Sequence, residues 1–249
     1  MLETSAAAPV TPSAPARPAA VVRVLAPLAG LALLSGCMTA KLDENRMMPT
    51  AITADEGIVI LAKPQVEGTG AEEDFMGCVG EKLAKGERPM KVFANQRFQD
   101  QLYPWFEPST APVRAEGVTS LLNRPKVATR LAETGVRYVV WVDGNTRRTD
   151  GGGSIACGAA PGAAGCIGFG WWEKQSDYVA TVWDLKTAKS AGSVSTNITG
   201  TSAMVGLVVP LPFIARVQGT ACDRLAGQLR GFLQGADPSA LPGAGGGGH

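Results

Sequence analysis

The feature that most constrains this chain is an apolar run near its start, residues 24–34, followed closely by Cys37. A run of eleven residues is shorter than the ~20 that a membrane-spanning helix needs, but it suits the core of a secretory signal peptide. Arg17 and Arg23 precede it, and no acidic residue lies between Glu3 and the run. We therefore expect residues 1–36 to be a signal peptide that is removed. The alternative is an uncleaved amphipathic or buried segment.

The residues that follow this run, Leu34-Ser35-Gly36-Cys37, resemble the lipobox of bacterial lipoproteins. In that family the cysteine thiol takes a diacylglycerol, the chain is cut before the cysteine, and the new amino group receives a further fatty acyl chain such as palmitate. The resemblance implies that Cys37 is the first mature residue and the lipid attachment site, with enough acyl chains for stable anchoring. Met38 stands where an aspartate would signal retention in the inner membrane. We therefore expect an outer-membrane lipoprotein that faces the periplasm.

Charge and composition limit what the mature chain can bind. Residues 1–36 hold two of the 23 basic and one of the 22 acidic residues, so 21 of each remain. With this balance, the mature chain lacks the excess of basic residues that is typical of nucleic-acid-binding proteins. The sequence predicts the lipidated cysteine and a flexible tether over residues 37–56, a single periplasmic domain over 57–235, and a disordered Gly-rich tail over 236–249.

The four cysteines that remain beside Cys37 indicate disulfides, because an even number in an exported chain is typical of paired thiols. Four cysteines allow three connectivities. We favour Cys157–Cys166, which closes a short Gly-rich loop, and Cys78–Cys222, which joins two expected helices. Free buried thiols are the alternative.

Hydrophobic periodicity predicts an α+β domain: a mixed, mainly antiparallel sheet flanked by about three helices. The segment 137–143 is apolar on both faces and should be a central strand. Residues 96–112, which contain several prolines, and the Gly-rich segment 150–170 are expected to be loops. The expected strands are 57–62, 90–94, 137–143, 176–184 and 191–200, and the expected helices are 71–86, 124–135 and 220–234.

Two stretches carry a resemblance to a known group of proteins. Residues 131–144 form a helix end followed by a strand that ends in glycine, and residues 178–190 form a strand that ends in aspartate and a turn. These patterns resemble the periplasmic lipoprotein superfamily that includes the curli-secretion lipoprotein CsgG, FlgO-type flagellar proteins and LpoB-type activators of peptidoglycan synthases. The resemblance implies a sheet flanked by helices and a role in envelope assembly. It transfers no functional residue, because the turn here reads Lys-Thr-Ala-Lys and lacks the glycine of the family.

The residues for common catalytic chemistry are missing. The only histidine is His249, at the end of the tail, so no Ser-His-Asp or Cys-His arrangement and no histidine-based zinc site is expected. No glycine motif has the order of a dinucleotide fingerprint. We predict a protein that is not an enzyme and that needs no cofactor or metal. A carboxylate-dependent envelope hydrolase is an alternative, because a pair of carboxylates suffices for glycoside cleavage.

Two apolar segments are candidates for an interaction surface. Aromatic residues at the end of the Gly-rich loop either cover the edge of the core or anchor a partner. The apolar segment 202–215 is either a contact surface for a partner or membrane, or an ordinary buried strand. The candidate residues are Phe169, Trp171, Trp172, Val208, Leu211 and Phe213.

These observations predict a non-enzymatic, lipid-anchored envelope protein that serves as a protein-interaction or assembly module. Its partners would be the membrane, through the lipid anchor, and another envelope protein. A ring-forming export component of the curli-secretion type is the main alternative, and it would make the chain an oligomer.

Overall fold

A computed structural model describes residues 38–63, 71–86, 88–107 and 109–236 of the chain. The expected signal peptide with Cys37, and the expected Gly-rich tail from residue 237 onward, lie outside the described residues. All described residues belong to one compact unit.

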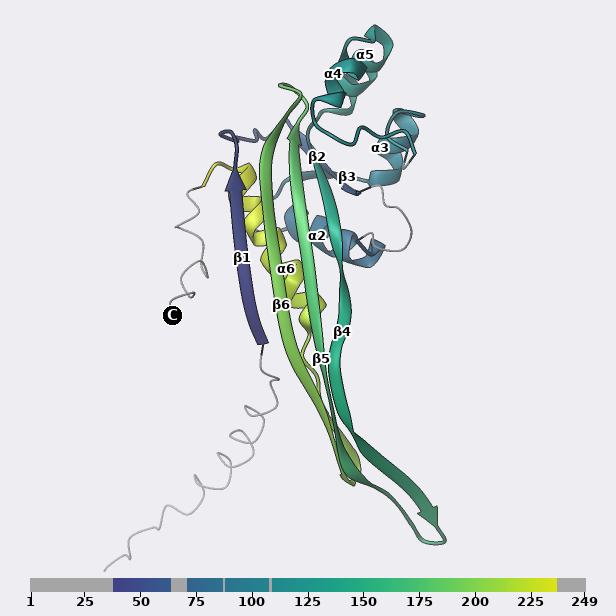
Figure 1. The fold of residues 1–249 in the computed structure, drawn as a ribbon. Coiled ribbons are helices and arrows are strands. Elements are labelled where there is room, and N and C mark those ends of the chain that lie inside the picture. The colour runs from purple at the N-terminus through teal and green to yellow at the C-terminus, as the bar shows by residue number, and fades with distance from the viewer. Residues whose placement is uncertain (1–37, 64–70, 87, 108, 237–249) are drawn as a thin grey trace, which may run out of the picture. The chain divides into compact units, whose positions relative to one another are not determined.

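Three long neighbouring strands dominate a single seven-stranded sheet with the order β1-β6-β5-β4-β2-β3, in which β7 also pairs with β6. Strands β2, β3 and β4 are parallel to one another, and all other pairs are antiparallel. The expected mixed, mainly antiparallel α+β fold is therefore confirmed (Figure 1). The strands are β1 (Met38–Arg46), β2 (Gly57–Ala62), β3 (Lys91–Phe93), β4 (Val136–Ala160), β5 (Ala163–Asp184), β6 (Lys189–Val208) and β7 (Pro210–Phe213).

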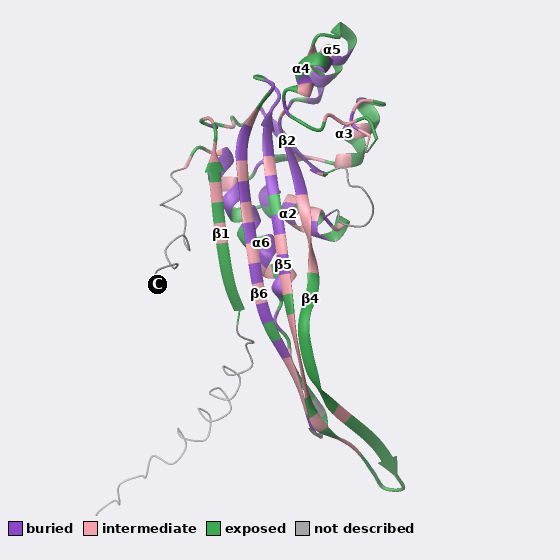
Figure 2. Ribbon diagram, in the orientation of Figure 1, coloured by how far each residue is buried: buried purple, intermediate pink, exposed green. Residues whose placement is uncertain are grey.

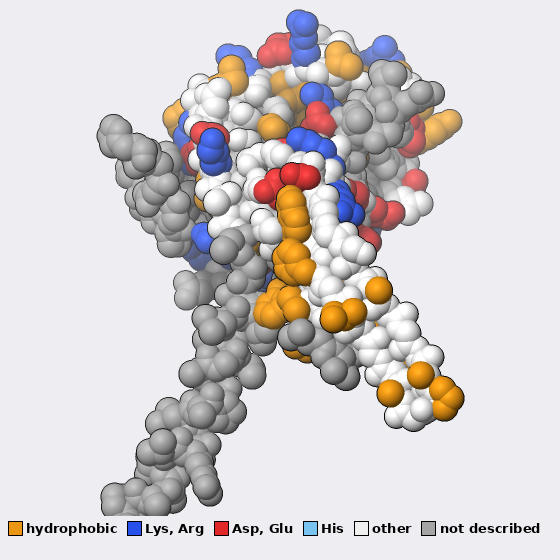
Figure 3. All heavy atoms as spheres, turned by 60° about the horizontal axis from the view of Figure 1, so that its bottom comes forward, with side chains coloured by type: hydrophobic (Ala, Val, Ile, Leu, Met, Phe, Trp, Pro, Cys, Tyr) orange, Lys and Arg blue, Asp and Glu red, His pale blue; other side chains and the backbone are white. Residues whose placement is uncertain are grey.

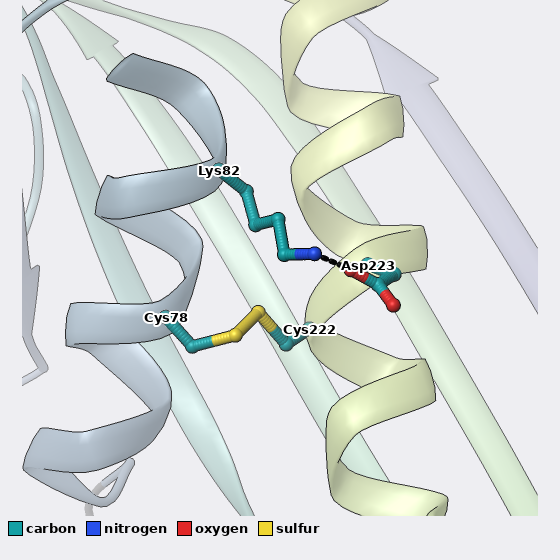
Figure 4. Close-up of a disulfide and its surroundings, with 4 residues drawn as sticks. All are labelled: Cys78, Lys82, Cys222 and Asp223. Carbon is teal, nitrogen blue, oxygen red and sulfur yellow. Dashed lines mark ion pairs between the residues drawn. A yellow bond between two sulfur atoms is a disulfide. The ribbon is translucent and has the colours of Figure 1, made fainter. Parts of the chain in front are cut away.

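Helices α2 (Glu73–Ala84) and α6 (Val217–Leu233) cover one face of the sheet. Acidic residues begin α2, where they favour the positive end of the helix dipole. The apolar stripes of both helices pack on the side chains that β2, β4, β5 and β6 direct to this face. Cys78 of α2 and Cys222 of α6 form a disulfide with a Cα–Cα distance of 6.3 Å (Figure 4). This is one of the two cysteine pairs that the sequence favours.

A second core lies on the opposite face of the sheet. Helices α3 (Asn95–Gln101), α4 (Gly117–Leu122) and α5 (Pro125–Thr134) contribute to it, together with Trp141 and Trp183 from the sheet. Pro125 occupies the first turn of α5, where its missing N–H costs nothing. Gly135 ends that helix with φ of 68°, a left-handed conformation that favours glycine.

The structure corrects three expectations about local structure. Residues 38–46 of the expected tether form β1, because a polar segment with alternate half-buried side chains can pair as an edge strand. The expected Gly-rich loop 150–170 is instead the continuation of β4 and β5 as one long hairpin. The described residues contain five helices rather than about three, because α3 and α4 form within and after the proline-containing segment 96–112.

Candidate functional site: the sheet extension

The central strands continue well beyond the part of the sheet that the helices cover. Helix α6 begins at Val217, whose side chain lies beside Gly200 of β6. Past this level the sheet consists of residues 151–160 of β4, 163–172 of β5 and 202–208 of β6, together with β7; we call this part the sheet extension. Figure 2 shows that purple, buried residues give way to exposed and half-buried ones toward the tip of the hairpin.

No charged residue occurs in the sheet extension. The segments 151–172 and 202–213 contain no Asp, Glu, Lys or Arg, although the whole chain has 45 such residues among 249. Charges appear directly at its border, where Asp150 pairs with Glu173 and Lys174 lies opposite Gly200. An exposed apolar surface of this kind usually marks a contact with a protein or a membrane.

The ladder register places most of the large side chains of the extension on one face. Phe169 is paired with Val205, which is paired with Leu211 of β7. Trp171 is paired in the same way with Ala203, which is paired with Phe213. Because paired residues share a face of an antiparallel sheet, these side chains lie together with Ile167 on the face opposite α2 and α6.

This apolar face is open to solvent. Ile167, Phe169 and Leu211 are 74%, 50% and 52% exposed. Figure 3 shows orange hydrophobic side chains gathered in a stripe along this part of the molecule. The indole of Trp171 lies over Gly152, where a β-carbon would come within 3.4 Å of its Nε1. Glycine at this position therefore leaves the ring room to lie against the sheet.

The opposite face of the extension carries the second disulfide and, nearer its border, Trp172. Cys157 and Cys166 are direct cross-strand partners, with a Cα–Cα distance of 4.0 Å. Beside them lie Ile155 and Gly206, which approach each other closely. The disulfide ties β4 to β5 near the tip of the hairpin, where the helix layer is absent. It thereby restrains the part of the sheet with the least tertiary support.

The structure brings together the two segments that the sequence singled out separately. Phe169, Trp171, Leu211 and Phe213 share one face of the extension, whereas Trp172 points to the other face beside Ser202. The backbone of Val208 pairs with Cys166, and its side chain is outside the described part. Sequence reasoning missed Ile167 and Val205. Alternation of apolar residues with glycine over 165–171 was the signal that would have found the first of them.

A charged cluster lies at the other end of the sheet. Arg137 donates a hydrogen bond to Glu56 at 2.9 Å and one to Asp184 at 3.3 Å, and Lys186 donates a further hydrogen bond to Glu56. Burial by itself would raise the pKa of Glu56, but the hydrogen bonds from Lys186 and Arg137 outweigh it and lower this pKa to about 2. The cluster ties the loop before β2 to β4 and to the turn after β5, which is a structural role.

A second polar cluster joins helix α2 to the sheet. The hydroxyl of Tyr178 donates a hydrogen bond to Glu72, and Thr146 contacts the same hydroxyl at 3.0 Å. The ring of Tyr178 also stacks on Phe75, with ring centroids 3.5 Å apart. Burial and the hydrogen bond to Glu72 raise the pKa of Tyr178 to about 12. This tyrosine therefore stays protonated at physiological pH and fixes the start of α2.

A hollow of about 260 Å³ lies beside the second core, between Trp141, Trp183 and the segment 112–116. The buried Nε1 of Trp141 has no hydrogen-bond partner among the described residues. A buried indole N–H usually finds an acceptor. Lys63, Arg114, Glu116, Thr181 and Ser190 also line this hollow, so Trp141 is one of several polar groups around it.

Two features are absent from the part of the chain that the structure describes. Among the described residues, no group of three or more His, Cys, Asp or Glu side chains is placed to hold a metal ion. Within the same part of the chain, no helix is long and apolar enough to cross a membrane.

Comparisons with known proteins place the chain in no family. No family model matches it, and no curated protein matches it. Among solved structures, it is similar to a PelC variant from Paraburkholderia phytofirmans, solved as a dodecamer, with 11% identity and a TM-score of 0.39 over 80% of this chain and 99% of that one. A second PelC dodecamer from the same organism gives 11% identity and a TM-score of 0.33, over 81% and 99% of the two chains.

Proposed function

We propose that this chain is a lipid-anchored protein of the cell envelope, attached to the outer membrane through Cys37, with its domain in the periplasm. It acts there as a non-enzymatic module for interaction or assembly. The observation that carries the proposal is the sheet extension, a charge-free, solvent-exposed surface built on a rigid sheet. The lipobox-like residues 34–37 and the two disulfides support the location, because disulfides persist in oxidising compartments outside the cytoplasm.

The test of the anchor is mass analysis of the protein purified from bacterial membranes. We expect the mature chain to begin at Cys37 and to carry the mass of a diacylglycerol and an additional acyl chain. The Cys37→Ser variant, expressed at the same level, should accumulate with residues 1–36 still attached and without lipid. A chain that starts at Met1 in both cases, with no added mass, would refute the proposed location.

A ring-forming export component is the second candidate, and one observation favours it. Beyond Val142, where the pairing with β2 ends, β4 pairs with β5 alone in the described chain. A long strand with one open edge can pair with another chain. Native mass spectrometry of the acylated protein in detergent separates the candidates, since a closed ring requires several copies and a simple adaptor needs only one.

A further inference from the structure

The sheet extension has the length and composition of a segment that enters lipid. Its two longest strand segments, 151–160 and 163–172, contain ten residues each, none of them charged. Ten residues at ~3.3 Å span about 33 Å, and a tilt of ~45° reduces this to about 23 Å, close to what a membrane-crossing strand covers. We propose that the sheet extension inserts into the lipid bilayer that anchors the chain, with its apolar face toward the acyl chains. The inference rests on the proposed lipid anchorage.

The side chains on the two faces fit this placement. Ile167, Phe169 and Leu211, each at least half exposed, lie on the face opposite α2 and α6, where no helix covers them. The other face presents the Cys157–Cys166 disulfide and glycines, with Ile155 and Trp172 among them, and it is uncharged as well. An ordinary water-exposed hairpin would carry charges on at least one face. Their absence from both faces over ten consecutive ladder pairs favours contact with lipid over contact with water.

The border of the extension matches a membrane surface. Trp171 and Trp172 are the last residues before Glu173, and tryptophan prefers the interface between lipid and water. Asp150, Glu173 and Lys174 then supply charges at the level where headgroups and water begin.

The first described residue, Met38, lies at this same level. Met38 pairs with Gly200, the direct neighbour of Lys174 in the ladder, and Cys37 precedes Met38 by one residue. Because β1 and β6 are antiparallel, Met38 is at the end of β1 nearer the sheet extension. An acylated Cys37 would therefore hold the body at the membrane with the extension directed into it.

Insertion also requires partners for the backbone. In lipid, each unpaired N–H or C=O is costly. In the extension, β5 pairs with both β4 and β6 from Cys166 onward, and β6 pairs with both β5 and β7 at residues 203–206. Strand β7 carries Pro210 and Pro212, which have no N–H to leave unpaired. The outer edge of β4 has no partner in the described chain over the extension, so we expect inserted copies to associate along this edge.

The experiment measures the depth of a single strand. Acylated full-length protein is reconstituted into phosphatidylcholine vesicles whose acyl chains carry bromine, a short-range quencher of tryptophan fluorescence. Trp171 and Trp172 are replaced by phenylalanine, and one tryptophan is then introduced by Phe169→Trp or by Val179→Trp. The other three of the five tryptophans of the chain belong to the second core, so the fluorescence of the protein with only the two phenylalanine replacements is subtracted from that of each variant. Positions 169 and 179 lie on the same face of β5, ten residues apart, and both are exposed, so Val179→Trp is the matched control.

We expect bromine to quench Phe169→Trp about twofold or more above Val179→Trp, since only position 169 would lie below the headgroups. If the protein floats with the vesicles but bromine quenches the two variants equally, insertion is refuted, whereas the proposed lipoprotein function is not. Protein that fails to float with the vesicles and lacks acyl mass would instead overturn the anchor. Unchanged circular dichroism confirms that both variants fold.

Discussion

The disulfide between Cys78 and Cys222 should contribute more stability than any other covalent feature of the fold. It joins α2 to α6 across 144 residues, whereas Cys157 and Cys166 are nine residues apart. In the chain-entropy model, closing the long loop is worth about 5 kcal/mol and closing the short one about 3 kcal/mol. The double variant Cys78→Ala/Cys222→Ala should therefore lose about 2 kcal/mol more than Cys157→Ala/Cys166→Ala. For a domain of ~200 residues, the loss of about 5 kcal/mol in Cys78→Ala/Cys222→Ala corresponds to a Tm lower by about 10–20 °C.

The assay is urea unfolding of the full chain in one detergent, followed by tryptophan fluorescence. Lys82→Ala is the control, because Lys82 and Asp223 form an exposed ion pair beside the disulfide (Figure 4). Such a pair is worth less than about 1 kcal/mol. Equal losses for the two double variants, or a greater loss for the short loop, would show that loop length does not control stability here.

Three further outcomes follow from particular contacts. The pKa of Glu56 is lowered from 4.5 to about 2, so the stability it contributes is present above pH 4.5 and is lost as pH falls toward 2. In the Glu56→Gln variant, the free energy of unfolding should fall by about 2 kcal/mol less over this pH range than in the wild type. This magnitude is reduced because the Lys186 ammonium is exposed to solvent. Gly144→Ala should lower the free energy of unfolding by more than about 2 kcal/mol in thermal unfolding, because φ is 130° and the new Cβ would lie 2.0 Å from a backbone oxygen. Gly77→Ala is the control in α2: its Cβ would meet no atom, and the variant should be more stable by up to about 1 kcal/mol. Ile167→Lys should change the free energy of unfolding by no more than about 0.5 kcal/mol, because Ile167 is exposed. In a bromine-quenching titration, the same variant should insert into vesicles less favourably by about 2–4 kcal/mol. A variant that inserts as well as the wild type would contradict a lipid-facing position.

Hydrophobic periodicity predicted the elements that bury one clear stripe or a continuous apolar run. Helices α2, α5 and α6 and the central strand at 137–143 all appear near their expected bounds. The favoured cysteine pairing also agrees with the structure, because Cys78 and Cys222 both lie on helices that pack on the same face. These features depend on short-range patterns that one sequence displays directly.

The sheet extension could not be predicted in the same way. Glycine is depleted in strands, so residues 150–170 indicated a loop, yet the backbone ladder from Tyr138–Asp184 continues to Ala160–Ala163. Pairing between residues 165–172 and 202–208 is a long-range register that no local pattern specifies. The candidate residues on each segment were therefore identified, but their meeting on one face was not.

Strand β5 runs from the helix-covered body to the tip of the hairpin, and β6 pairs with it as far as Cys166. Because the strand is continuous, the faces of the side chains at one end depend on the number of residues between the two ends. An extra residue inserted near Gln175 would reverse the faces of every side chain beyond it and turn Phe169 toward the side of α6. A second inserted residue would turn it back. The fold already contains one extra residue of this kind. The irregularity between Arg148 and Asp150 reverses the alternation of faces along β4 just before the sheet extension.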